Sequence, residues 1–109
     1  MEKIDSLIAL RDTLRAFAQA RDWRKFHTPK NLAMALIVEA AELVEQFQWS
    51  TAEESLAPSP EKLAAVRDEV ADTLIYLVEL ADVLDIDLLA AARDKIANNA
   101  IKYPAPEQR

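Results

Sequence analysis

The stretch PEKLAAVRDEVADTLIYLVELADVL, residues 60–84, carries the strongest structural signal in this chain. Its apolar positions recur every three or four residues, the period of one face of an α-helix: Leu63, Val66, Val70, Leu74, Leu77, Ala81 and Leu84. Ser59 precedes Pro60 and Glu61, a helix-start pattern in which serine caps free N–H groups and proline fits the first turn. The stretch therefore predicts a long amphipathic helix.

Two helices are predicted before this stretch. In the N-terminal segment apolar residues recur at near-helical spacing, although Arg11 interrupts them: Ile4, Leu7, Ile8, Leu14 and Phe17. Thr28 followed by Pro29 repeats the helix-start pattern. It predicts a second helix that runs from Pro29 to about Gln48.

A last helix is predicted after the long one, capped by Asp85 or Asp87 and ending before Pro104. Residues 50–58 form the only stretch for which we predict a loop of more than a few residues. Between the prolines the chain is rich in Ala, Leu, Glu, Lys and Arg, which are strong helix formers. We therefore predict an all-α fold, a four-helix bundle, in a single domain that spans residues 1–109.

The composition excludes several classes of site. The 109 residues are 51% hydrophobic, enough for one core, and contain no glycine. Without glycine the chain has no P-loop or Rossmann fingerprint and few options for tight β-hairpins. It has no cysteine, which excludes disulfides, thiolate zinc sites and cysteine nucleophiles. A single histidine, His27, excludes any metal site that takes two imidazoles from one chain.

The charge balance limits the partners. Thirteen Lys and Arg against nineteen Asp and Glu give a net charge of −6, the wrong sign for general binding to nucleic acid. No apolar run reaches the length of a membrane span. The first residues, MEKIDSLIALRD, place charges among the apolar positions and do not resemble a signal peptide. We expect a cytoplasmic protein that binds neither nucleic acid nor membrane.

Two pairs of carboxylates lie among apolar residues. Glu39 and Glu42 are three residues apart and share a face of the predicted second helix. Glu69 and Asp72 repeat this spacing in the long helix. The two rows continue along the same faces with Gln46 and Trp49 in the first, and Tyr76 and Glu79 in the second.

Carboxylates gathered away from water repel one another and are costly to desolvate. They can take up protons, pair with lysine or arginine, or bind a hard divalent cation. An oxygen-only ligand set suits Mg²⁺ or Mn²⁺. Di-iron bundles use Glu-x-x-His motifs, and neither pair contains histidine, so the sequence disfavours an iron site.

The alternative is that these acids form ordinary solvated helix faces. Either pair alone favours solvated faces. When both pairs occur in apolar segments, a metal site and solvated faces are equally favoured. The solvated interpretation is favoured for Glu45, Glu79 and Asp82, and for Asp68 beside Arg67.

Several short motifs together resemble those of one known family. They are Phe26-His-Thr-Pro-Lys-Asn31, Glu39-Ala-Ala-Glu42, Gln46-Phe-Gln-Trp49, Glu69-Val-Ala-Asp72 and Tyr76, with Arg21-Asp22 before Trp23 and the late series Lys95, Asn99, Tyr103 and Pro104. The combination resembles the all-α MazG-like nucleoside triphosphate pyrophosphohydrolases, and among them the single-domain dCTP pyrophosphatases. It covers about residues 21–104, so the expected bundle is a MazG-like one.

The resemblance implies a Mg²⁺-dependent cleavage between the α and β phosphates of a nucleoside triphosphate, with Mn²⁺ as a second option. Carried over by position, the implied metal ligands are Glu39, Glu42, Glu69 and Asp72. Glu42 or Glu39 is the candidate general base. The products would be the monophosphate and pyrophosphate, as in housecleaning of the nucleotide pool.

The resemblance also implies a substrate-binding set. Lys30, Lys95, Asn99 and Tyr103 are candidates to hold the phosphates. Trp23 and Trp49 would offer flat surfaces to the base, with Phe26 and His27 nearby, and Asn31 and Tyr76 complete the set. Local roles stay open for several of these, such as a helix C-terminal cation at Lys95 or hydrogen bonding at His27.

One position departs from the family pattern. Nine residues before Trp23, where the eukaryotic dCTP pyrophosphatases carry a nucleotide-contacting histidine, this chain has Leu14. Cytosine nucleotides remain the first expectation, and other dNTPs stay open. The resemblance further implies a homodimer or homotetramer. The alternative from another class is a non-catalytic helical module that binds nucleotides or a protein partner.

Overall fold

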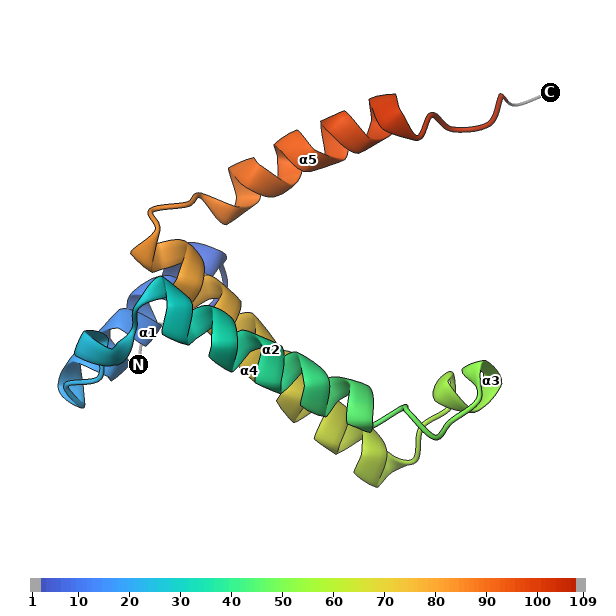
Figure 1. Ribbon diagram of the computed structural model, residues 1–109, viewed down its shortest axis with the longest axis horizontal. Coiled ribbons are helices and arrows are strands. Elements are labelled where there is room, and N and C mark those ends of the chain that lie inside the picture. The colour runs from blue at the N-terminus through green and yellow to red at the C-terminus, as the bar shows by residue number, and fades with distance from the viewer. Residues whose placement is uncertain (1–2, 108–109) are drawn as a thin grey trace.

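The computed structural model describes residues 3–107, and every regular element in that range is helical (Figure 1). In chain order the elements are α1 (Leu7–Ala20), the short 3-10 helix η1 (Arg24–Phe26), α2 (Pro29–Glu45), α3 (Ala52–Ser55), α4 (Pro60–Val83) and α5 (Leu88–Lys102). The prediction of an all-α fold is confirmed. The expected single domain also included residues 1–2 and 108–109, which lie outside the described residues.

Side-chain caps begin the helices at the predicted places. The hydroxyl groups of Thr28 and Ser59 each accept a hydrogen bond from the backbone N–H three residues on, at 3.2 Å. Asp87, rather than Asp85, caps α5 in the same way at 3.0 Å. Asp85 instead adopts a φ of 55° in the turn that follows α4, a left-handed conformation that aspartate tolerates better than most residues.

The connection between α2 and α4 differs in detail from the prediction. α2 ends at Glu45, before the predicted end near Gln48, and residues 46–49 form a turn. The predicted loop contains the single helical turn α3, which begins with a capping box between Thr51 and Glu54. Lys62 near the start of α4 donates a hydrogen bond to the backbone carbonyl of residue 46, at 2.6 Å, and so joins the two long helices.

Helices α2 and α4 pack side by side over most of their length and form the body of the chain (Figure 1). α1 packs against α4 near the C-terminal end of that helix. The most deeply buried apolar side chains are few: Ala18, Leu32, Val78 and Ala81. The face between α2 and α4 is therefore where the two predicted acidic pairs can meet.

α5 stands apart from this body. It contains no buried residue, and it extends away from the α2–α4 pair in Figure 1. The predicted four long helices are present, but one chain alone does not close them into a bundle. α5 follows the turn that contains Asp85 and leads away from the α2–α4 pair (Figure 1).

Large apolar side chains remain exposed on both long helices. On α4, much of the apolar row predicted from the sequence is at least 40% exposed: Leu63, Val70, Leu74, Leu77 and Leu84. On α2 the exposed set is Met34, Ile37, Val38 and Val44. Contiguous apolar surface of this kind is typical of an interaction site. Among residues 3–107, no helix has the length and hydropathy needed to cross a membrane.

Candidate metal centre

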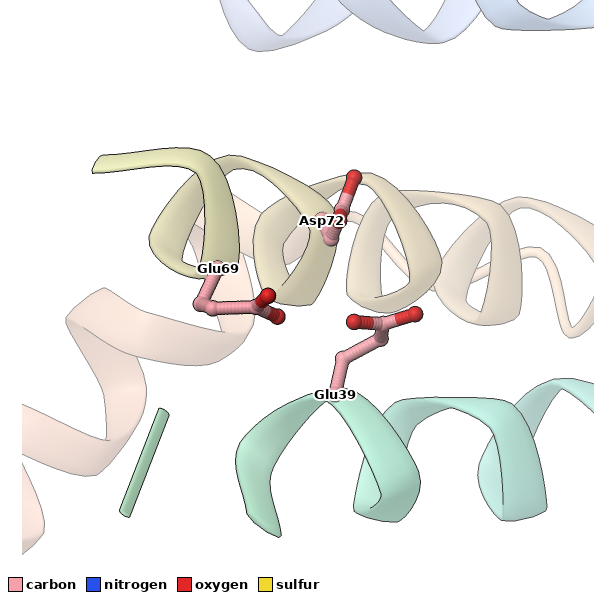
Figure 2. Close-up of side chains that lie close together, drawn as sticks. All are labelled: Glu39, Glu69 and Asp72. Atoms are coloured by element: carbon pink, nitrogen blue, oxygen red, sulfur yellow. The ribbon is translucent and has the colours of Figure 1, made fainter. Parts of the chain in front are cut away.

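Three carboxylates from the two long helices meet between them. Glu39 projects from α2 toward Glu69 and Asp72, which lie one turn apart on α4 (Figure 2). One oxygen atom from each residue lies within 4.8 Å of the others. The pairing of α2 with α4 has thus brought together acids that are thirty residues apart in the sequence.

The Oε2 atoms of Glu39 and Glu69 are buried and have no hydrogen-bond partner. A buried carboxylate oxygen without a partner is unfavourable unless a proton or a cation compensates it. Asp72 is exposed, so the cluster is open to solvent on one side. Two orphaned oxygens and one open side fit a hard cation that retains some of its waters, as Mg²⁺ does.

Burial and mutual repulsion shift the acidity of this cluster. Burial, followed by the neighbouring carboxyl groups of Glu39 and Glu42, raises the pKa of Glu69 to about 7. Burial is also the largest cause that raises the pKa of Glu39, with Glu42 and Asp72 adding to it and Glu69 acting in the opposite direction. Near neutral pH the metal-free cluster therefore holds a proton for part of the time.

Glu42 is the fourth ligand predicted from the sequence, and its position differs from the other three. It lies half-buried one turn after Glu39 on α2 and is not part of the group within 4.8 Å. It nevertheless raises the pKa of both Glu39 and Glu69, so it lies close to the cluster. Glu42 therefore lies next to the three carboxylates without being one of them.

Tyr76 lies one turn beyond Asp72 on the same helix. It is half-buried, and burial together with the charges of Glu39, Glu79 and Asp72 raises the pKa of its hydroxyl group. The phenol is thus a neutral hydrogen-bond donor beside an acidic cluster.

The sequence of the chain matches the sequence model of the MazG-like family over residues 34–109. This chain belongs to the MazG-like family. The match includes all four predicted metal-ligand positions. The wider resemblance described for residues 21–104 is confirmed at the level of the family.

Two relatives and one solved structure resemble the MazG-like chain closely. It is 47% identical over 90 residues to dCTP pyrophosphatase 1 of Bos taurus (81% of this chain, 53% of that protein) and 46% identical over 91 residues to dCTP pyrophosphatase 1 of Homo sapiens (82% and 54%). The chain therefore spans about half the length of these curated relatives. A crystal structure of a pyrophosphatase from Archaeoglobus fulgidus superposes with a TM-score of 0.87 at 40% identity, covering 96% of this chain and 98% of that one.

The short segment before α2 of the MazG-like chain holds several predicted substrate residues. Trp23 is half-exposed and meets Phe17 edge to face, with ring centroids 5.7 Å apart. Nδ1 of His27 lies 3.9 Å from Oε2 of Glu79. The Asn31 side chain donates to the carbonyl of residue 26 at 2.9 Å, which is a local contact that holds the start of α2.

The remaining predicted substrate residues are exposed. Trp49, at 90% exposure, stands in the turn after α2, and Lys30 lies on the first turn of that helix. Lys95 and Asn99 lie on α5, and Tyr103 follows it with the Lys102 ammonium 5.3 Å from its ring centroid. Within residues 3–107 of one MazG-like chain, no hydrogen bond or ion pair joins these side chains to the acidic cluster.

Two acids expected on a solvated face are instead sheltered. The side chains of Glu79 and Asp82 are only 15% and 7% exposed, because α1 and η1 cover this part of α4. Arg15 and Arg24 lie against Asp82, and His27 lies against Glu79. Apolar neighbours in the sequence do not distinguish these two acids from Glu45, which has apolar neighbours as well and is exposed. Glu45 and Asp68 are exposed, as expected.

Proposed function

We propose that this chain is a Mg²⁺-dependent nucleoside triphosphate pyrophosphohydrolase, with dCTP or a related dNTP as its substrate. The observation that carries the proposal is the pair of buried, unpartnered carboxylate oxygens of Glu39 and Glu69 facing Asp72. Support comes from relatives named dCTP pyrophosphatase 1 and from a structural neighbour described as a pyrophosphatase. The products are the nucleoside monophosphate and pyrophosphate.

Glu39, Glu69 and Asp72 would hold Mg²⁺, with Mn²⁺ as a substitute, and Glu42 completes the set from the adjacent turn. Bound there, Mg²⁺ would supply charge neutralisation for the phosphates and a lower pKa for the attacking water. Glu42 lies beside the three and is our candidate general base, with Glu39 as the alternative. Tyr76 donates a hydrogen bond from its neutral hydroxyl group to a phosphate oxygen.

The phosphates need cationic side chains, which the acidic cluster does not provide. Lys30, Lys95, Asn99 and Tyr103 are the proposed phosphate contacts, and Trp23, Trp49, His27 and Asn31 are the proposed contacts around the nucleoside. Lys95 and Asn99 lie on α5, and this helix extends away from the α2–α4 pair of its own chain (Figure 1). We propose that they act on the cluster of a second copy.

A homo-oligomer also accounts for the exposed apolar surface. α5 has fifteen residues and no buried side chain, and isolated helices of about 12–15 residues are only marginally stable in water. The exposed apolar rows of α2 and α4 can cover such a helix or each other in a homodimer or homotetramer. Ile37→Glu on α2 should reduce the mass measured by light scattering and leave the helical circular dichroism unchanged. An unchanged mass would contradict this interface.

We further propose a cytoplasmic housecleaning role, with neither nucleic acid nor membrane as a partner. The net charge of −6 supports the exclusion of nucleic acid. The competing function is a non-catalytic helical module. No observation favours it, since a solvated acidic face would not bury two carboxylate oxygens without partners.

The test is to incubate the purified protein with each canonical dNTP and NTP and with 5-methyl-dCTP, with Mg²⁺ or with EDTA, and to resolve the products. We expect monophosphate and pyrophosphate only with metal, and the highest rate with a cytosine nucleotide. The order of substrates also shows what Leu14 does to base selection. A folded sample that yields no product from any substrate would overturn the enzyme proposal in favour of the binding module.

A further inference from the structure

Asp82 of α4 is a nearly buried carboxylate that the acidic cluster does not include. Nε of Arg15, on α1, donates to its Oδ2 at 2.8 Å, and Nη2 of the same residue donates to Oδ1. Nη1 of Arg24, the first residue of η1, lies 3.6 Å from Oδ2. One acid on α4 therefore holds two arginines that come from two different elements.

The most deeply buried apolar side chains between α1 and α4 are small, while Leu7 and Leu14 of α1 lie half-buried beside them. Ala18 of α1 and Ala81 of α4 are buried there with Val78. Small residues let two helices approach closely, but they offer few ridges that would fix the crossing angle. The two-pronged hydrogen bond between Arg15 and Asp82 is directional, so it can set how α1 lies on α4.

The ring of Trp23 packs against α1. Its edge-to-face partner Phe17 lies on α1, and the backbone N–H of Trp23 donates to the carbonyl of residue 18 at 2.9 Å. The guanidinium carbon of Arg21 lies 3.4 Å from the ring centroid of Phe17 and 5.9 Å from that of Trp23. A change in the placement of α1 therefore moves the Trp23 ring.

We infer that Asp82 is a positioning residue, which sets where the Trp23 ring lies relative to the acidic cluster on α4. About 15 Å of a single continuous helix separates Asp72 from Asp82. The proposed metal ligands lie on α4, which is joined to α1 through Asp82 and Arg15. The Trp23 ring packs on α1, so it is connected to the cluster by this route. The inference rests on the proposed function, in which the ring supports the base while the cluster acts on the phosphates.

The kinetic test is Asp82→Asn, which keeps the size of the side chain and removes its charge. We expect the KM for the best substrate to rise about tenfold, because a displaced support weakens binding of the base. kcat and the Mg²⁺ concentration at half-saturation should change less than about twofold, since the cluster is untouched. Asp68→Asn, the same substitution at an exposed site of α4, should leave all three values unchanged. An unchanged KM in folded Asp82→Asn would overturn the inference.

A second readout does not need turnover. In a Trp49→Phe background Trp23 is the only tryptophan, and its fluorescence reports the packing of the ring. Asp82→Asn should shift its emission to longer wavelength and increase its quenching by acrylamide. If the parent protein turns over no nucleotide, the proposed function fails, and this signal still tests the positioning of the ring. An emission spectrum and quenching that do not change would contradict the inference.

Two further variants distinguish a loss of fold stability from a displacement of the Trp23 ring. Arg15→Lys keeps the charge but lacks the forked donors, and it should raise KM in the same direction as Asp82→Asn. The double variant Arg15→Leu/Asp82→Leu removes both charges together, so neither member of the pair is left without its partner. We expect it to melt near the parent temperature and keep a raised KM. A parental KM in this double variant would show that the pair has only a structural role.

Discussion

Glu39 of α2 and Glu69 of α4 face each other across the helix pair, and each has one carboxylate oxygen buried without a hydrogen-bond partner (Figure 2). With Asp72 they form a cluster whose negative charge needs a proton or a cation to compensate it. Most of the testable behaviour of this chain follows from that arrangement.

Removing one charge from the cluster should raise the stability of the metal-free protein and lower its activity. Glu69→Gln relieves repulsion, so the metal-free variant should melt above the metal-free wild type. In the proposed function Glu69 is a metal ligand, so the same change should lower turnover by about 100-fold or more, since metal catalysis contributes several kcal/mol. Melting curves and turnover, with Asp68→Asn as the matched exposed control, measure both effects. A variant with wild-type turnover would exclude Glu69 as a ligand.

Mg²⁺ should stabilise the folded chain, because the cluster forms only when α2 and α4 pack together. At a free concentration of 100 times Kd the gain is about 2.7 kcal/mol. For a domain of this size that corresponds to a rise on the order of 10 °C in the melting temperature. EDTA should reverse the rise, and a melting temperature that Mg²⁺ does not change would count against a metal site.

The stability of the metal-free protein should decrease as pH rises toward neutrality. The pKa of Glu69 is about 7 in the folded chain, above its ordinary value of 4.5. The folded state therefore binds more protons than the unfolded state between about pH 4.5 and 7. The stabilisation from the proton on Glu69 is fully present below pH 4.5 and is lost as pH rises through about 7.

Saturating Mg²⁺ should reduce or reverse this dependence, because the metal replaces the proton and binds more tightly as pH rises. Thermal melts at several pH values, with Mg²⁺ or with EDTA, make the comparison. Parallel curves in the two conditions would show that the metal and the proton do not compete for the cluster.

Sequence patterns predicted most of the local structure. Thr28 and Ser59 are caps because their hydroxyl groups reach the N–H three residues on, which is a property of neighbouring residues. The meeting of Glu39 with Glu69 and Asp72 could be anticipated because acids among apolar residues need compensation. Helical spacing alone indicated that each pair shares a face.

Contacts between distant elements could not be predicted in this way. Asp82 was expected in solvent, yet Arg15 and Arg24 cover it because α1 crosses α4 at that point. The periodic row on α4 predicted a core face, whereas Leu74 and Leu77 are 40% exposed in a single chain. Periodicity shows that a face is apolar, and it does not show whether the same chain or a second copy covers it.

The few buried residues should carry much of the packing energy of the single chain. Leu32→Ala should lower the free energy of unfolding by about 2–5 kcal/mol, because Leu32 is 2% exposed and its truncation leaves a cavity. Leu56→Ala, the same change at 85% exposure, should alter it by about 0.5 kcal/mol or less. Urea unfolding of both variants tests this difference, and equal losses would show that Leu32 is not the core residue we describe.

The most direct measurement compares wild type, Glu69→Gln and Asp68→Asn for hydrolysis of dCTP, with Mg²⁺ and with EDTA, and resolves every phosphate product. The account predicts dCMP and pyrophosphate from wild type and from Asp68→Asn in Mg²⁺ only, and almost none from Glu69→Gln. Turnover in EDTA, or turnover by Glu69→Gln equal to wild type, would contradict the claim that this carboxylate cluster is the metal centre of a pyrophosphohydrolase.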